Sequence, residues 1–211
     1  MINEANQYLQ FEKLLRQRGI HAAGNESFDL DIVDQYEKDY AVLILDSSGF
    51  TRITAKYGII HFLALTIRMQ EIVNPLLTDH QVLESWAEAD NLYGIFMTAK
   101  AAVQAALSIQ EAINAENQKR PESDRLAVCI GIGFGPLLNV GEKHIYGQEM
   151  NFASKLGEDI ASSGEILITK AAYEAMWHQV SGLNAIKFTL TVSSVSIEYY
   201  SIRAQGRVSW T

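Results

Sequence analysis

The sequence predicts an α+β fold in which helices pack on one sheet. Short apolar runs of strand length alternate with longer segments in which apolar residues recur at helical spacing. The chain has 211 residues, of which 48% are hydrophobic and 20% charged, as in ordinary globular proteins. This length suits one domain with a short appendage. We expect residues 1–39 to form an N-terminal helix and an acidic linker, and residues 40–211 to form the domain.

The N-terminal segment predicts a single helix. Tyr8, Phe11 and Leu15 recur at helical spacing within residues 5–18, and Gly19 ends the helix. Residues 20–39 are mixed and acidic, which favours a linker. The domain is expected to begin at Tyr40.

The next elements alternate in an order that defines the fold class. YAVLILD, at 40–46, predicts a buried strand that ends in a carboxylate, and a turn with Ser47, Ser48 and Gly49 follows it. Apolar spacing then predicts a helix over 51–76, strands over 81–87 and 90–97, an alanine-rich helix over 99–116 and a strand over 126–132. Strand, helix, strand, strand, helix, strand is the βαββαβ order of a ferredoxin-like sheet.

The remaining residues extend this core. The pattern predicts a hairpin at 135–146, a helix at about 148–157, a strand at 164–169 with the sequence GEILIT, a helix at 170–178 and two C-terminal strands. The complete expectation is a ferredoxin-like core extended by a hairpin, helices and strands.

Charge and cysteine content exclude several classes of protein. The formal net charge is −8 and the 17 Lys and Arg residues form no basic block, which argues against nucleic-acid binding. Cys129 is the single cysteine and lies in the apolar run LAVCIGI, which predicts a buried, inert thiol. No apolar leader and no membrane-length apolar run is visible, so we expect a cytoplasmic protein that does not bind membranes.

Two aspartates lie where chemistry is expected. Asp46 ends the first strand of the core and Asp90 begins the third, and these strands are central neighbours in a βαββαβ sheet. Converging carboxylates without nearby His or Cys suit hard cations such as Mg²⁺ or Mn²⁺, shared with phosphate oxygens. The alternative is ordinary turn chemistry, since aspartate is common at strand ends.

The turn after Asp46 predicts an anion site. Residues 47–51, with the sequence SSGFT, lead from a strand into a helix, where backbone N–H groups and the helix dipole favour phosphate. The alternative is a helix cap, in which Ser48 or Thr51 satisfies the first helical N–H groups.

These residues resemble a known family. LDSSGFTRIT is similar to the D-x-x-G-F-T segment of class III nucleotidyl cyclase catalytic domains, and EADNLYGIF, LAVCIGIGFGP, YGQEMNFASKL and GEILIT follow in the family's order. The resemblance covers about residues 40–203. It implies a head-to-tail homodimer whose active sites lie at the interface and convert a nucleoside triphosphate into a 3′,5′-cyclic nucleotide and pyrophosphate.

The resemblance also implies site residues. Asp46 and Asp90, with the backbone carbonyl of Ser47, match the ligands of two divalent cations, Mn²⁺ or Mg²⁺. The turn residues Ser48, Gly49, Phe50 and Thr51 would bind substrate phosphates. Asn151 matches the asparagine that positions the ribose, and Lys155 stands where the family has a transition-state arginine.

Two departures concern the base. Trp86 and His144 stand where the family has its purine-reading residues, and neither purine code is present. A rigid indole shrinks the pocket, which favours a pyrimidine, UTP over CTP, whose base edge would meet His144 or the indole N–H. The chain resembles in this the bacterial antiphage cyclases, whose product acts on a separate effector. The alternatives are packing at a dimer seam for Trp86 and a hairpin-turn role for His144.

Two further departures concern turnover. Lys155 lacks the planar fork of arginine, and the C-terminal region that carries a triphosphate-binding lysine in many relatives has none here. Arg52, Lys56 and Lys143 are candidate replacements, each with a solvated surface role as its alternative. Two other functions therefore stay open: an adenylyl cyclase with unusual base recognition, and a catalytically weak nucleotide-binding homologue.

Overall fold

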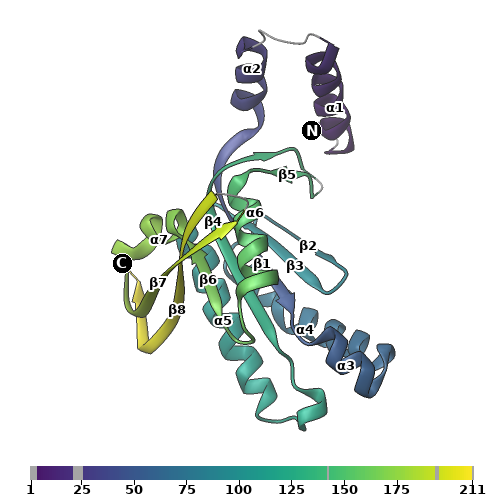
Figure 1. The fold of residues 1–211 in the computed structure, drawn as a ribbon, viewed down its shortest axis with the longest axis vertical. Coiled ribbons are helices and arrows are strands. Elements are labelled where there is room, and N and C mark those ends of the chain that lie inside the picture. The colour runs from purple at the N-terminus through teal and green to yellow at the C-terminus, as the bar shows by residue number, and fades with distance from the viewer. Residues whose placement is uncertain (1–3, 21–25, 142, 193–194, 211) are drawn as a thin grey trace.

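The computed structural model describes residues 4–20, 26–141, 143–192 and 195–210, and it has the predicted α+β fold. One sheet has the strand order β2-β3-β1-β4-β6-β8-β7, and β5 pairs with β4 off this path (Figure 1). Residues 21–25 of the predicted linker, residue 142 of the predicted hairpin, and residues 193–194 of the predicted C-terminal strands lie outside the described residues.

The predicted βαββαβ core is present, and its strands form the β2-β3-β1-β4 part of the sheet. Its elements are β1 (Glu37–Ser47), α3 (Phe50–Tyr57), α4 (Ile59–Asp79), β2 (Glu84–Glu88), β3 (Asn91–Phe96), α5 (Ala99–Asn117) and β4 (Val128–Asn139). β1 lies between β3 and β4 and is antiparallel to both. The first strand is therefore central, as expected, and its carboxyl end lies beside the β2–β3 turn.

The C-terminal elements extend this core. They are β5 (Ile145–Tyr146), α6 (Gln148–Ser154), the π-helix η2 (Lys155–Ile160), β6 (Ile166–Thr169), α7 (Lys170–Met176), the short helix η3 (Trp177–Gln179), β7 (Val180–Val192) and β8 (Val195–Trp210). A 3₁₀ turn, η1 (Glu122–Asp124), lies in the loop between α5 and β4.

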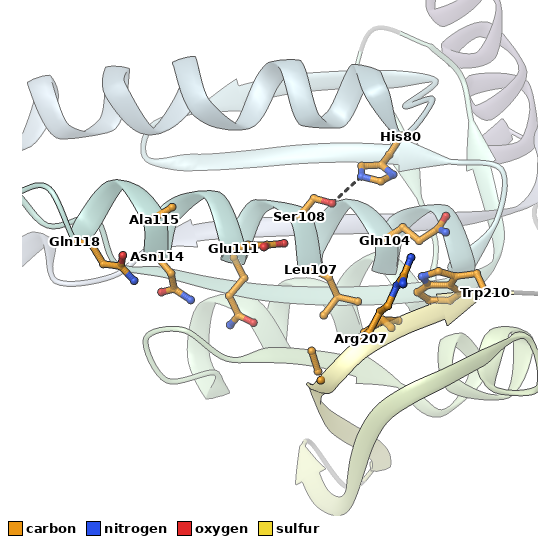
Figure 2. A pocket seen from close by; sticks show the side chains of 14 residues that line it. His80, Gln104, Leu107, Ser108, Glu111, Asn114, Ala115, Gln118, Arg207 and Trp210 are labelled. Carbon is orange, nitrogen blue, oxygen red and sulfur yellow. Dashed lines mark hydrogen bonds between the residues drawn. The ribbon is translucent and has the colours of Figure 1, made fainter.

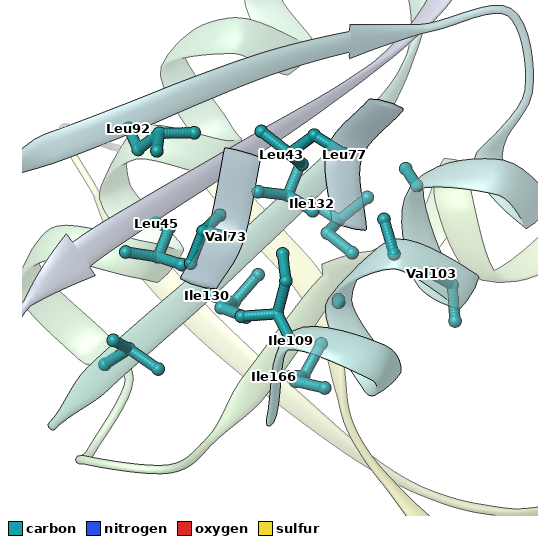
Figure 3. Packing of buried hydrophobic residues seen from close by; sticks show 14 of the residues in the cluster. Leu43, Leu45, Val73, Leu77, Leu92, Val103, Ile109, Ile130, Ile132 and Ile166 are labelled. Carbon is teal, nitrogen blue, oxygen red and sulfur yellow. The ribbon is translucent and has the colours of Figure 1, made fainter. Parts of the chain in front are cut away.

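Both faces of β1 are covered, which explains its continuous apolar run. Leu43 and Leu45 belong to the main core, between the sheet and the helices α4 and α5 (Figure 3). Val42 and Ile44 point to the other face and pack in a second cluster with Trp86. Because side chains alternate along a strand, Asp46 lies on the same face as Val42 and Ile44.

Two predicted segments differ from the structure. The expected helix over 51–76 is divided at Gly58, whose φ of 87° is left-handed and ends α3 before α4 begins. The prediction of a linker is wrong over α2 (Glu26–Tyr36), since Ile32 and Tyr36 are buried against Phe11 of α1 (Glu4–Ile20) and Val140. β1 consequently begins at Glu37, and the division into an appendage and a domain stays a prediction.

Within the described ranges, no helix combines the length and the apolar character that are needed to cross a membrane.

Candidate active site

The two predicted metal aspartates lie at the same end of the sheet. β1 and β3 are antiparallel and pair Leu45 with Leu92, so Asp46 at the end of β1 lies beside the turn that carries Asp90. Both carboxylates line one cavity of about 440 Å³, which we name the carboxylate cavity. Its residues are Asp46, Ser47, Ser48, Gly49, Phe50, Thr51, Arg52, Asp90, Cys129, Glu158 and Ala161.

The predicted phosphate-binding turn forms one wall of this cavity. Gly49 is the N-cap of α3 with a φ of 97°, and no side chain caps this helix. The alternative that Ser48 or Thr51 serves as its side-chain cap is therefore wrong. The Ser48 N–H donates to the carbonyl oxygen of Ala127 at 2.9 Å, which ties the turn to β4. The following N–H groups lie at the N-terminus of α3, where the helix dipole favours anions.

The carboxylate cavity has strongly acidic electrostatics. Burial, together with the nearby charges of Asp90 and Glu158, raises the pKa of Asp46 to about 6. A cation bound here would lower that pKa, because it would favour the ionised carboxylates. Among the described residues, no group of three or more His, Cys, Asp or Glu side chains has the arrangement of a metal site, so protein carboxylates alone do not complete one.

Two residues at this site were not predicted from the sequence. Glu158 comes from the π-helix η2, in which the Ala161 N–H donates to the carbonyl oxygen of Leu156, five residues earlier. Asn91 begins β3, next to Leu92, which pairs with Leu45. It donates to Glu158 Oε1 at 3.0 Å, and its buried Oδ1 has no hydrogen-bond partner. Asn91 could have been predicted from the sequence because it directly follows Asp90. The position of Glu158 could not, because it depends on the wider turn of the π-helix.

Cys129 lines the carboxylate cavity as an inert thiol. It is a free, buried cysteine of β4, paired in register with Asp46. Burial raises its pKa to about 11, with a further contribution from the charge of Asp46. The thiolate form is therefore scarce at neutral pH, as the apolar run predicted.

Three basic residues were candidates to replace the triphosphate-binding lysine of the family. Of these, Arg52 lines the carboxylate cavity. Its guanidinium folds back over the turn, so that a Cβ added at Gly49 would lie 3.3 Å from Arg52 Nη2. Lys56 Nζ lies 5.0 Å from the ring centroid of Tyr57 instead. Lys143 belongs to the β4–β5 turn, where its backbone N–H donates to Glu84 Oε1.

Trp86 is buried within its own chain. Its exposed fraction is 9%, and it packs with Val42, Ile44 and Ile95. Its ring stacks on Tyr93 at a centroid distance of 5.0 Å and an interplanar angle of 6°. Core packing therefore covers most of the indole surface. A base could contact only the small part of the ring that stays exposed.

His144 lies at the opposite end of β1 from the aspartates. It is in the β4–β5 turn, just beyond Leu138, which pairs with Glu37 at the start of β1. The nine-residue step from Glu37 to Asp46 spans about 30 Å at the rise of a strand. The structure thus does not bring His144 and the aspartates of one chain together.

Asn151 and Lys155 lie on the helical segment that covers the sheet face bearing Asp46. Asn151 is exposed on α6. Lys155 begins η2, is part-buried, and forms an ion pair with Asp159 at 2.5 Å, one turn further on. Neither side chain is buried in the core of its own chain.

A second cavity, of about 860 Å³, lies between α5 and the end of β8 (Figure 2). It is lined largely by amide and small side chains of α5, with Arg207 and Trp210 on β8 and a hydrogen bond of 2.9 Å between His80 and Ser108. No predicted site residue lines it. Size alone therefore does not identify the functional site of this chain.

Comparisons with known proteins support the same fold. No family model matches the chain. It is 26% identical over 134 residues to a protein of Rhizobium meliloti (strain 1021) named "Putative adenylate cyclase 3", a match that covers 64% of this chain and 22% of that protein. The chain thus spans about a fifth of that relative's length.

Solved structures match nearly over their whole length. The adenylate/guanylate cyclase/hydrolase from Silicibacter pomeroyi has a TM-score of 0.68 at 22% identity, covering 78% of this chain and 96% of that one. The adenylyl cyclase CyaB from P. aeruginosa has a TM-score of 0.68 at 20% identity, covering 81% and 96%. The chain therefore has the fold of these cyclases.

Proposed function

We propose that this chain is a metal-dependent nucleotidyl cyclase, which converts a nucleoside triphosphate into a 3′,5′-cyclic nucleotide and pyrophosphate. The observation that carries the proposal is the meeting of Asp46 and Asp90 in one cavity with the turn that opens α3. A carboxylate pair and a helix N-terminus side by side suit a triphosphate with its cations. The fold of the solved cyclases supports this reading.

The residues of the carboxylate cavity fit divalent cations. Asp46 and Asp90 supply carboxylate oxygens, and Ser47 offers a backbone carbonyl beside them. Mg²⁺ is usually held by one or two carboxylates together with substrate phosphates, which agrees with this donor set. When bound, two such cations, Mn²⁺ or Mg²⁺, would neutralise phosphate charge and polarise the reacting groups.

The chain's own groups would hold the substrate. On this proposal the N–H groups of residues 49–51 and the guanidinium of Arg52 bind phosphate oxygens, and Ser48 lines the same wall of the cavity. Asn151 positions the ribose and Lys155 offsets the negative charge that develops on the oxygens of the reacting phosphate. The ion pair of Lys155 with Asp159 would hold part of that charge back, which favours slow turnover.

Two chains are needed to complete this site. The separation of about 30 Å along β1 between the His144 end and Asp46 exceeds the length of a nucleoside triphosphate. A head-to-tail homodimer would bring His144, Asn151 and Lys155 of one protomer to the aspartates of its partner. This gives two equivalent composite sites.

A pyrimidine base, UTP over CTP, is the finer part of the proposal. Trp86 is fixed by its stack on Tyr93, so it cannot swing aside to admit a larger base. The product would be a second messenger, made in the cytoplasm during antiphage signalling and acting on a separate effector. An adenylyl cyclase is the second candidate, which the name of the Rhizobium meliloti relative favours.

Product analysis across the four nucleotides tests the proposal. The purified protein with Mn²⁺ is incubated with ATP, GTP, UTP or CTP, and cyclic nucleotide and pyrophosphate are measured by mass spectrometry. We expect equimolar cyclic UMP and pyrophosphate from UTP, less product from CTP, and little from purines. Turnover of ATP alone would support the second candidate, and binding without pyrophosphate release would contradict cyclase activity.

Matched variants tie any activity to the carboxylate cavity. Asp46→Asn and Asp90→Asn should abolish the product. Glu88→Gln removes an exposed carboxylate of the same hairpin that does not line the cavity, and should leave activity unchanged. Thermal unfolding of each variant shows whether it is folded.

A further inference from the structure

A tyrosine from the N-terminal helix lies flat on His144. The rings of Tyr8 and His144 stack at a centroid distance of 3.7 Å with an interplanar angle of 15°. Tyr8 belongs to α1, outside the βαββαβ core, and α1 lies beside the β5 hairpin (Figure 1). This contact joins the appendage to the residue expected to meet the base.

The stack is part of an anchored arrangement. Phe11, one helical turn after Tyr8, is buried with Ile32, Tyr36 and Val140, and it stacks on Tyr146 at a centroid distance of 6.0 Å. The Val140 N–H also donates to the carbonyl oxygen of His144 at 3.0 Å. The helix and the hairpin are thus held together independently of the Tyr8 ring.

The edges of the imidazole are in different environments. The Tyr146 hydroxyl lies 3.4 Å from His144 Nδ1. Nε2 forms no hydrogen bond with any residue of the described ranges. A phenol that donates to Nδ1 leaves the proton on Nε2, so Nε2–H becomes the free donor of a neutral ring.

We propose that Tyr8 is a positioning residue, which with Tyr146 holds His144 as an Nε2–H donor toward the base and thereby selects uracil over cytosine. The inference rests on the proposed function, in which the dimer brings His144 to the nucleotide, and it takes His144 as the group that meets the base edge. Uracil presents a carbonyl acceptor at position 4, where cytosine presents an amino donor. A fixed donor therefore favours UTP, because an amino group would leave two donors facing each other.

The stack leaves this edge available. Tyr8 covers a face of the imidazole, whereas base recognition by hydrogen bonds uses the ring's edge. A tyrosine that instead blocked the base would act as an inhibitor, and removing it would raise the turnover of every nucleotide. The two roles thus predict opposite changes.

Histidine spectra test the stack without any catalysis. The full chain is labelled with ¹⁵N-histidine, and the His144 signals are assigned from their loss in His144→Gln. We expect the Nε2–H form in the wild type and in Tyr8→Phe, which keeps the ring. Tyr146→Phe removes the donor and should shift the His144 signals toward the other tautomer, and Tyr8→Ala should give mobile, averaged signals.

Kinetics with matched variants test the consequence for selectivity. The ratio of kcat/KM for UTP to that for CTP should fall about three- to tenfold in Tyr8→Ala, as expected for the loss of one aromatic stack. It should stay within about twofold of the wild type in Tyr8→Phe. Leu9→Ala is the control, since Leu9 is exposed on the same helix.

Each outcome decides the inference. An unchanged ratio in Tyr8→Ala, an equal fall in Leu9→Ala or Tyr8→Phe, or a general rise in turnover in Tyr8→Ala would overturn it. If the wild type makes no cyclic nucleotide, the proposed function fails. In that case the spectra still show whether Tyr8 and Tyr146 fix the His144 ring, and a ring unaffected by both variants overturns the positioning role itself.

Discussion

Gly131 of β4 lies directly beneath Ala153 of α6, so close that a Cβ on Gly131 would stand 2.0 Å from the Ala153 carbonyl oxygen. Glycine at this position lets the backbone of α6 rest on the sheet. Gly133 repeats the arrangement against Glu149, whose carbonyl oxygen would lie 2.5 Å from an added Cβ. These close approaches fix the height of α6, and with it the positions of Asn151 and Lys155.

Gly131→Ala is expected to lift α6 and weaken both stability and activity. Relief of the overlap should cost about 1–3 kcal/mol in the free energy of unfolding, as for other overpacked positions. A displacement of Asn151 by about 1 Å should lower kcat by roughly 100-fold. Urea unfolding and cyclase assays measure the two effects.

Gly19→Ala serves as the control for Gly131→Ala. An added Cβ at Gly19 meets no atom within 4 Å, and the residue lies within α1. Alanine there should be neutral or stabilising by up to about 1 kcal/mol. Equal losses in the two variants would contradict the close-packing argument.

Asp46→Asn should stabilise the metal-free protein at high pH. Burial, together with Asp90 and Glu158, raises the pKa of Asp46 from 3.8 to about 6. Between these values the folded state keeps a proton that the unfolded state has lost, so the free energy of unfolding falls as the pH rises through this window. The asparagine variant lacks this penalty and should gain about 1 kcal/mol at pH 8, allowing for the solvent that reaches the side chain.

Thermal or urea unfolding in EDTA, at several pH values from 4 to 8, measures this effect. The gain should shrink toward zero as the pH approaches 4. A constant difference at every pH would show that the carboxylate is not strained by its neighbours. The same variant should make no cyclic nucleotide, so stability and activity would change in opposite directions.

Trp86→Phe is expected to relax base selection while the chain stays folded. Phenylalanine keeps a ring on Tyr93 but leaves space beside it, so the ratio of ATP to UTP turnover should rise about tenfold. Trp86→Ala should instead lose about 3–5 kcal/mol, because Trp86 is buried with Val42 and Ile44. Steady-state kinetics and thermal unfolding separate the two effects.

Tyr93→Phe is the matched variant for Trp86→Phe. It keeps the stacking ring and removes only the hydroxyl that accepts from Asn91 Nδ2 at 3.4 Å. The nucleotide preference should remain that of the wild type. If the ratio of ATP to UTP turnover did not change in Trp86→Phe, the steric argument for a pyrimidine would be contradicted.

The fold and the aspartates were predictable because local pattern determines them. β1 is apolar on both faces since both are buried, and the carboxylate after its last apolar residue marks the end of the strand. The order of strands and helices then places Asp46 and Asp90 together. Their cavity follows from the antiparallel register of β1 and β3.

Other features depend on contacts that are distant in the sequence. α2 was predicted as a linker because its composition is acidic, but Ile32 and Tyr36 become buried once α1 folds against them. Glu158 reaches the carboxylate cavity through a π-helix, which no spacing indicated. The stack of Tyr8 on His144 joins residues 136 positions apart, so it required the structure.

Arg52→Gln should weaken binding of the triphosphate. Arg52 lies over the turn in a cavity with three carboxylates and forms no ion pair with any residue in the described part of the chain. A charge-assisted hydrogen bond contributes about 1.5–3 kcal/mol, so its loss should raise KM for UTP and the inhibition constant of pyrophosphate roughly 10- to 100-fold. Mn²⁺ affinity, measured by calorimetry, should not fall, because a positive charge beside the carboxylates has been removed. Lys56→Gln removes the same charge one turn further along α3, where the ammonium lies by the Tyr57 ring, and should leave both constants unchanged. If Lys56→Gln alone weakened pyrophosphate binding, the phosphate contact would belong to Lys56, and the role inferred for Arg52 would be wrong.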